Sequence, residues 1–180
     1  MKIRQAGFTL IELMIVVSLV AILASLAVPS FRGLLVNRTV QAATDALMTD
    51  MRYARSEAVK RSARVTLCQS GNGTSCATGS NLWVSGWIVF IDDDGDGTVD
   101  AEDEIVRVQQ ALNSISSIAS TTPAMDRRFF TFQPTGWAKS ANQTFIFTPS
   151  GTVPVGSVRV VCISNQGRAG LKAAGATACT

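Results

Sequence analysis

The chain contains no histidine, one tyrosine and five prolines among its 180 residues. Without histidine it lacks the commonest general acid–base residue and a frequent zinc ligand. No serine or cysteine stands in a nucleophile motif, and no glycine-rich loop of the kind that cradles phosphate is present in the sequence. These absences argue against an enzyme.

Charged residues are also scarce, at 16% of a chain long enough for one ordinary domain. Eight of the thirteen Asp and Glu lie in residues 92–104, and the rest of the chain carries sixteen Lys and Arg against five acids. The body is therefore basic and one short segment is acidic. A basic body fits contact with nucleic acid or an anionic membrane, and it equally fits ordinary solubility.

The four cysteines are Cys68, Cys76, Cys162 and Cys179. An even number in an exported chain indicates disulfides, whereas zinc favours closer pairs such as C-x-x-C, often joined by histidine. Three pairings are open, and we favour the two local ones, Cys68–Cys76 and Cys162–Cys179. Disulfides place the domain in an oxidising compartment, such as a bacterial periplasm or the cell exterior.

A long apolar run follows a short basic start. Lys2 and Arg4 precede residues 8–28, a stretch of about 21 residues that matches one bilayer core as a helix. The positive-inside rule keeps the two basic residues in the cytoplasm, which leaves the bulk of the chain outside it. The run is too long for an ordinary secretory signal, and no A-x-A-like site follows it. We therefore expect a single membrane-spanning helix over residues 8–28.

Glu12 interrupts the apolar run, where a carboxylate is costly unless it is paired. The surrounding residues 7–12, G-F-T-L-I-E, resemble the class III signal of type IV pilins and type II secretion pseudopilins. The resemblance implies that residues 1–7 are a leader that a prepilin peptidase removes between Gly7 and Phe8, and that the new Phe8 amine is N-methylated. It also implies that the Glu12 carboxylate pairs with the Phe8 amine of a neighbouring subunit during assembly. Pro29 matches the family too, in which a proline kinks or interrupts the long helix.

A helical pattern continues beyond the apolar run. Seven residues form one apolar stripe at helical spacing: Val36, Val40, Ala43, Leu47, Met51, Ala54 and Ala58. Charged residues occupy the other faces, among them Asp50, Arg52, Arg55 and Glu57, which we interpret as a solvated surface with Glu57 as partner of the arginines. We expect one helix up to about Arg61, with residues 29–62 as its amphipathic half docked on a sheet.

Two further segments resemble the GspH/FimT subgroup of minor pilins. Residues 52–59, R-Y-A-R-S-E-A-V, look like the end of that family's helix. Residues 86–92, G-W-I-V-F-I-D, are similar to its strand leading into an acidic turn. The resemblance implies an α+β type IV pilin-like fold, with a long N-terminal helix packed on an antiparallel β-sheet head domain.

From residue 63 to residue 180 short β segments replace the helical pattern. We expect strands over residues 64–69, 87–91, 105–109, 128–133, 144–148 and 157–164, separated by glycine- and proline-containing turns. We expect the aromatic residues to lie in the core or on a sheet face: Trp83, Trp87, Phe90, Phe129, Phe130, Phe132, Trp137, Phe145 and Phe147.

The acidic segment resembles a calcium-binding loop. Residues 92–103 read D-D-D-G-D-G-T-V-D-A-E-D, with acids at positions 1, 3, 5 and 12 and glycine at position 6. An EF-hand carries Glu rather than Asp at position 12, and here strands rather than helices flank the loop. The predicted ligands are Asp92, Asp94, Asp96, Thr98 and Asp103. The alternative is a solvated hairpin loop without a metal, and we expect no cofactor other than this one candidate, calcium.

The C-terminal segment contains a partial DNA-binding motif. In FimT-like pilins linked to natural transformation, a C-terminal G-R-x-R element binds DNA. Gly167 and Arg168 match its start, Gly170 stands where the second arginine belongs, and Lys172 could supply the missing charge. Arg168 and Lys172 would then contact phosphates without sequence preference. The alternative is a surface turn closed by the Cys162–Cys179 disulfide.

Three non-enzymatic functions follow from the resemblance. The first is a minor pilin that helps to initiate a type IV pilus at its tip. The second is a minor pseudopilin of a type II secretion system, and the third is a DNA-uptake pilin. In each case the expected location is the bacterial inner membrane, with the head in the periplasm, and then a pilus or pseudopilus. The expected partners are other pilins or pseudopilins through the N-terminal helix, the prepilin peptidase and, in the third case, DNA.

Overall fold

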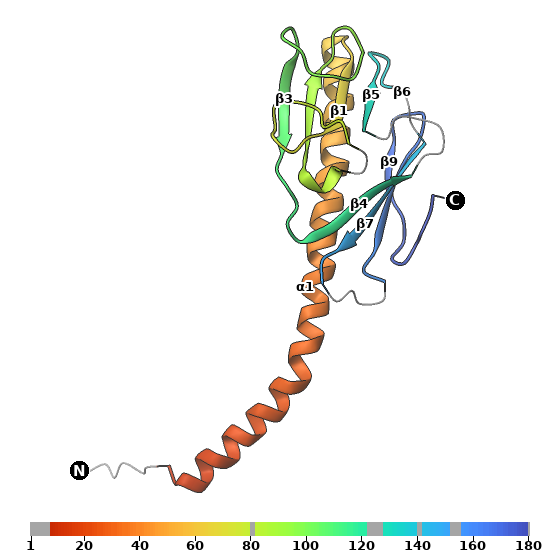
Figure 1. The fold of residues 1–180 in the computed structure, drawn as a ribbon. Coiled ribbons are helices and arrows are strands. Elements are labelled where there is room, and N and C mark those ends of the chain that lie inside the picture. Colours follow the sequence, from red (N-terminus) through yellow and green to blue (C-terminus); the bar gives the residue numbers. More distant parts are fainter. Residues whose placement is uncertain (1–7, 80–81, 122–127, 140–141, 152–155, 180) are drawn as a thin grey trace, which may run out of the picture. The chain divides into compact units, whose positions relative to one another are not determined.

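The fold is taken from a computed structural model that describes residues 8–79, 82–121, 128–139, 142–151 and 156–179, without the side chains of residues 26–30 and 121. Gly7 lies outside the described residues. The chain divides into two compact units, Met1–Leu35 and Val36–Thr180. One α-helix, α1 (Leu10–Arg61), runs through both of them (Figure 1). We describe each unit by itself.

The first unit contains the apolar start of α1. Thr9 and Glu12 form a capping box: the Glu12 amide donates to Thr9 Oγ1 at 3.3 Å, and the Thr9 amide donates to Glu12 Oε2 at 2.9 Å. The large apolar side chains from Leu10 to Leu23 are between 52% and 77% exposed. These residues form a helix because the cap fixes its start and no glycine or proline follows within the next turns.

Two expectations concern this helix: that Pro29 kinks or interrupts it, and that residues 8–28 cross a membrane. One helix continues from Leu10 to Arg61, so Pro29 does not interrupt it. Because proline has no amide hydrogen, it donates no backbone hydrogen bond to the helix, and the long helical stretches on both sides maintain the helix around it. In the part of the chain that the structure describes, no helical stretch is both long enough and apolar enough to cross a membrane.

The second unit begins with the amphipathic part of α1, and the predicted stripe lies inside it. Val40, Ala43, Leu47, Met51, Ala54 and Ala58 are buried, and Val36 is half-buried. The helix ends in a Schellman motif, in which Ser62 takes a φ of 54° and the Ala63 amide donates to the Ala58 carbonyl at 3.3 Å. Lys60 and Arg61 in the last turn complement the negative end of the helix dipole.

Two antiparallel sheets complete the second unit. The five-stranded sheet has the order β3-β2-β1-β5-β6, formed by Glu104–Gln109, Trp87–Ile91, Val65–Gln69, Phe129–Phe132 and Ala138–Lys139. The four-stranded sheet has the order β4-β7-β8-β9, formed by Ile115–Thr121, Gln143–Pro149, Arg159–Ile163 and Ala169–Leu171 (Figure 1).

The larger of two apolar clusters joins the helix to both sheets, and a smaller one gathers Cys68, Ile88 and Phe90. Trp83, on the short 3-10 helix η1 (Trp83–Ser85), packs edge-on against Phe145 with ring centroids 5.1 Å apart, and Phe130 packs edge-on against Phe132. The helical stripe contributes to the same core. The aromatic residues therefore lie in the core or on a sheet face, as the sequence predicted, except Trp137, which is 58% exposed; Phe129 is half-buried on β5 and packs against the smaller cluster. Trp137 precedes the two-residue edge strand β6, which offers little cover.

The structure contains the two local disulfides, Cys68–Cys76 and Cys162–Cys179. Cys68 lies on β1 and Cys162 on β8, so each bridge ties a loop or the C-terminal segment to a central strand. No described cysteine is free.

Candidate functional site

The Thr9–Glu12 pair places a carboxylate at the start of the apolar helix. Both the amide and the hydroxyl of Thr9 donate to Glu12 Oε2, at 2.9 Å each. Phe8 is 90% exposed. The carboxylate is therefore held beside the backbone that begins with the predicted mature N-terminus, Phe8.

Asp50 lies on the core-facing side of α1 and is only 2% exposed. Its carboxylate accepts a hydrogen bond from Trp87 Nε1 at 2.8 Å and forms an ion pair with Arg107, whose Nε lies 2.6 Å from Oδ1. The Arg107 guanidinium also lies over the Tyr53 ring, 5.3 Å from the centroid. Burial raises the pKa of Asp50, and the Trp87 and Arg107 contacts oppose that rise. The interpretation of Asp50 as part of a solvated face is wrong, because this network fastens the helix to β2 and β3.

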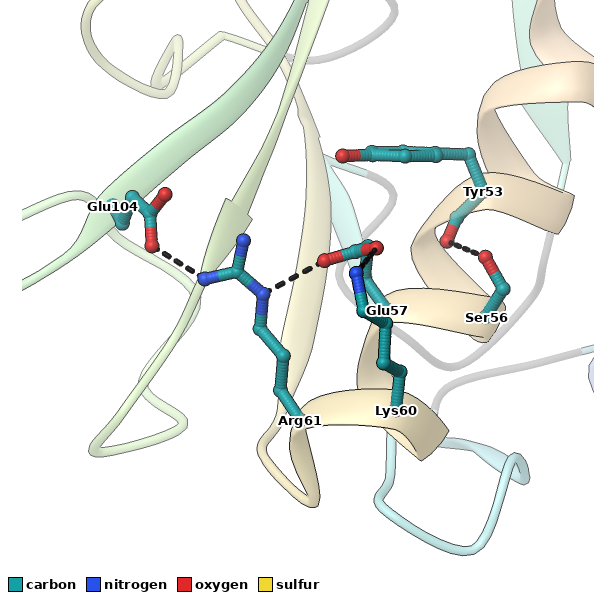
Figure 2. Close-up of polar contacts among 6 residues, drawn as sticks. All are labelled: Tyr53, Ser56, Glu57, Lys60, Arg61 and Glu104. Carbon is teal, nitrogen blue, oxygen red and sulfur yellow. Dashed lines mark hydrogen bonds and ion pairs between the residues drawn. The ribbon is translucent and has the colours of Figure 1, made fainter.

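A second ionic group closes the end of the helix. Glu57 accepts from Arg61 at 2.7 Å and from Lys60 at 3.4 Å, and Arg61 reaches on to Glu104 on β3 at 2.5 Å (Figure 2). The hydrogen bond from Arg61, aided by Lys60, lowers the pKa of Glu57 against the opposing effect of burial. Glu57 is therefore held as a carboxylate at the junction of helix and sheet.

The expected partners of Glu57 were different. The sequence interpretation paired it with Arg52 and Arg55, but the two basic residues that follow it along the helix take that place. Among the described residues, Arg52 and Arg55 take part in no ion pair. These two arginines border a groove instead.

The groove lies between the end of α1 and the turn that leads into β9, with a volume of about 620 Å³. The helix contributes Arg52, Arg55, Val59 and Lys60, and the turn contributes Arg168. Val59 is 53% exposed and adds an apolar surface to this basic lining. The groove thus brings four basic side chains together beside Val59 and Ala169, and we call it the basic groove.

The structure divides the two residues that the C-terminal motif singled out. Arg168 lines the basic groove, whereas Lys172 does not line it. The Lys172 amide donates to the Val160 carbonyl at 2.9 Å and so extends the β8–β9 pairing by one position. The motif therefore located one wall of the groove but not the wall formed by the helix.

The acidic loop brings three of its predicted calcium ligands together. Carboxylate oxygens of Asp92, Asp94 and Asp96 lie within 4.8 Å of one another. Hard oxygen ligands of this kind suit calcium, so the three residues fit such an ion. Burial raises the pKa of Asp92, and the charges of Asp103 and Asp94 raise it further, against hydrogen bonds from Thr66 and Gly95.

Amides and hydroxyls of the same loop also donate hydrogen bonds to several of its own carboxylates. Asp103 accepts from the amides of Asp93 and Asp100, at 3.2 and 3.1 Å. Asp96 accepts from the Thr98 amide and hydroxyl, both at 2.7 Å. Thr98 and Asp103 thus stabilise the turn, and calcium binding stays a prediction.

Comparison with known families assigns the chain. A sequence model described as Type II transport protein GspH matches residues 43–167. The chain belongs to the GspH family. A second model, the prokaryotic N-terminal methylation motif, matches residues 2–28 of this GspH-family chain. The protein is therefore of the minor pilin and pseudopilin type, as the motifs predicted.

Solved structures of similar fold support this assignment. Two crystal structures of the type IV minor pilin FimU of Pseudomonas aeruginosa are 21% and 22% identical, with TM-scores of 0.54 and 0.52. They cover 74% and 73% of this chain, and the matches span 87% and 91% of the FimU chains. The minor pseudopilin EpsH of the Vibrio cholerae type 2 secretion system is 10% identical, with a TM-score of 0.52, over 74% of this chain and 96% of its own. The expected α+β, type IV pilin-like fold is confirmed.

Sequence reasoning missed Asp50, although a signal was present. Asp50 follows Leu47 by three positions and precedes Ala54 by four, so it lies in register with the apolar stripe. Glu57 stands three positions after Ala54 and is buried for the same reason. An acid in a core-facing register predicts a partner from the sheet.

Proposed function

We propose that this GspH-family chain is a minor, non-enzymatic subunit of a type IV pilus that helps to initiate assembly at the tip. A prepilin peptidase cleaves between Gly7 and Phe8, and the new Phe8 amine is N-methylated. Before assembly, the subunit is anchored in the bacterial inner membrane with its head in the periplasm, and it then enters the filament. The observation that carries this proposal is the methylation motif over residues 2–28, followed by a helix of exposed apolar side chains.

Glu12 supplies the chemistry of assembly. Its carboxylate meets the charged Phe8 amine of a neighbouring subunit, and two opposite charges attract strongly where water is excluded. Thr9 already holds Oε2 of Glu12 at 2.9 Å, so the carboxylate is oriented before the partner arrives. The apolar faces of neighbouring helices then bury one another.

Substitution of Glu12 and Gly7 tests this mechanism. Glu12→Val in the full chain should insert in the membrane but assemble poorly, and a matched Glu102→Val variant in the exposed acidic loop should assemble normally. Immunoblots of sheared pili measure both. Gly7→Ala, or a bulkier residue, should leave the leader uncleaved. Wild-type assembly of Glu12→Val, or a normally shortened Gly7 variant, would contradict the proposal.

The alternative machine is a type II secretion system, in which the chain would be a minor pseudopilin. The name of the matching family and the fold shared with EpsH favour this candidate. Deleting the gene separates the two functions. Loss of surface pili and twitching with normal exoprotein secretion supports the pilus, and the opposite pattern supports the secretion system.

A third candidate is a DNA-uptake pilin, in which the tail binds incoming DNA. Arg168 favours it, because this side chain lines a basic groove. The test is a gel shift with residues 36–180 across a salt series, comparing the wild type with Arg168→Ala/Lys172→Ala. Salt-sensitive binding that disappears in the double variant supports this function, and no shift at low salt rejects it.

Calcium is the one ion that we propose for the head, held by Asp92, Asp94 and Asp96. The ion would neutralise the clustered carboxylates and stiffen the hairpin loop. Calorimetry with calcium chloride should give heat for the wild type and much less for Asp94→Asn. Absence of heat at millimolar calcium ends the proposal.

A further inference from the structure

Most of the positive charge in the basic groove has no local counter-charge. Arg52, Arg55 and Arg168 belong to none of the ion pairs among the described residues, and Lys60 has only Glu57, at 3.4 Å. Like charges brought together on one surface repel, and an anionic ligand relieves that repulsion. The groove is therefore complementary to an anion.

The strand beside the groove has an unpaired edge. β9 ends its sheet, and Ala169 belongs both to β9 and to the lining of the groove. The Ser164 amide donates to the Arg168 carbonyl at 3.0 Å, and the Lys172 amide donates to the Val160 carbonyl at 2.9 Å. Hydrogen-bonded positions alternate along each strand of an antiparallel pair, so the amide and carbonyl groups of Ala169 and Leu171 point away from β8.

Space is open along this edge. In the part of the chain that the structure describes, β9 has only β8 as a partner, and Leu171 is exposed. Above the sheet, a Cβ built at Gly170 would meet no atom within 4 Å, so that face of β9 is uncovered as well. The free amides and carbonyls of β9 can therefore accept one more extended backbone.

The two features together select the class of ligand. Only a polypeptide backbone can match the alternating donors and acceptors of a free strand edge. None of the residues that line the groove is aromatic, so it offers no surface on which a nucleic acid base could stack. Carboxylates on the same polypeptide satisfy the arginines, which bind them through two parallel hydrogen bonds.

We propose that the basic groove and the free edge of β9 dock an extended, carboxylate-rich segment of a neighbouring filament subunit. This inference rests on the proposed function only for the identity of the partner. The segment adds a strand to β9, and its acidic side chains reach Arg168 on one wall and Arg55 on the other. Such a contact fixes the rotation of neighbouring heads, which the apolar helices by themselves leave free.

Binding of a defined peptide tests the proposal. Residues 36–180 contain every core residue of the described chain and both disulfides, so this unit is a self-contained fold. The probe is a peptide of about ten residues that alternates Glu and Thr, which favours a strand with one acidic face. The control probe replaces every Glu by Lys. Calorimetry gives the affinity, and amide hydrogen exchange reports protection at Ala169 and Leu171.

Two variants separate the charge from the strand edge. Arg55→Glu/Arg168→Glu should weaken the acidic peptide by at least about tenfold, through repulsion and lost hydrogen bonds. The matched control is Arg38→Glu/Lys139→Glu, because both residues are exposed and lie outside the groove. Leu171→Pro removes an outward-facing amide without changing charge and should also weaken the peptide. Thermal melts verify that each variant is folded.

Three outcomes overturn the proposal. They are no peptide binding by the wild type, equal binding by Arg55→Glu/Arg168→Glu, and tighter binding of duplex or single-stranded DNA through the same arginines. The last result makes the groove a nucleic acid site. Because the assay uses the isolated head, its failure leaves the Glu12 assembly mechanism untouched, and normal assembly of Glu12→Val leaves the docking site untouched.

Discussion

Two acidic side chains of α1 face inward, and each ties the helix to a strand. Asp50 joins Trp87 on β2 and Arg107 on β3, and Glu57 reaches Glu104 on β3 through Arg61. Buried carboxylates are expensive unless they are fully partnered. Both contacts therefore position the helix on the sheet, and both are open to simple substitution.

Asp50→Ala should destabilise the head by about 3 kcal/mol, because it leaves the Trp87 indole N–H buried without an acceptor. The bond to Arg107 contributes less, since that side chain is 45% exposed and partly solvated. Asp50→Asn retains an acceptor and should cost about 1 kcal/mol. Urea denaturation of residues 36–180 measures both variants, and equal losses would contradict this division.

Glu57 should make stability depend on acid. Its pKa in the fold is lowered from the ordinary value of 4.5, chiefly by the hydrogen bond from Arg61. The stabilisation is therefore complete above pH 4.5 and is lost as the pH falls through the lowered pKa of Glu57. Glu57→Gln removes this dependence. Subtracting its denaturation curves from those of the wild type between pH 7 and about pH 3 should show a difference that shrinks with acid, and a constant difference would reject the assignment.

At the scale of elements, the approach of η1 to β2 depends on Gly86. This residue has a φ of 111°, its amide donates to the Trp83 carbonyl, and its carbonyl accepts from the Ser70 amide. A Cβ at this position would lie 2.2 Å from the Gln109 carbonyl oxygen, which belongs to the backbone. A backbone atom cannot turn aside as a side chain does, so the site requires glycine.

Gly86→Ala should cost more than about 3 kcal/mol or prevent folding, through both the clash and the positive φ. Gly170→Ala on β9 is the matched control, because the added methyl meets nothing within 4 Å there. It should change stability by less than about 0.5 kcal/mol. Thermal melts of both variants, made in residues 36–180, measure the two changes in stability. A Gly86 variant with wild-type stability would show that β2 and β3 can separate.

At the scale of the whole molecule, the two units differ in what they bury. The head buries most of its aromatic residues, and the helical stripe lies in its larger core. In the first unit, the large apolar side chains whose exposure the structure describes are more than half exposed in the single chain. Such a surface is unstable in water and requires lipid or neighbouring subunits.

Residues 36–180 should therefore be monomeric and fold cooperatively in buffer, whereas the cleaved full-length chain should aggregate without detergent. Analytical ultracentrifugation and circular dichroism measure the two. A full-length control with Leu13, Val17 and Val20 changed to lysine should regain solubility, because charge on the apolar surface opposes association. An aggregating or molten head fragment would contradict the division into units.

The sequence by itself determined the features that depend on local spacing and chemistry. The helical stripe, β2 at Trp87–Ile91, and the motif around Gly7 and Glu12 are each written in consecutive residues. Three strands escaped prediction: β4, β6 and β9. A bulge between Ile115 and Ser117 breaks the alternation of β4, and β6 and β9 are too short to show a period.

Only the tertiary structure decided which distant residues meet. Arg107 reaches Asp50, and Arg168 joins Arg52 and Arg55 across the basic groove, because the strands return to the helix at those points. No local pattern carries that information, since the pairing register and the turns set it jointly. The sequence thus specified the N-terminal motif and the secondary structure around it, and the folded head created the basic groove.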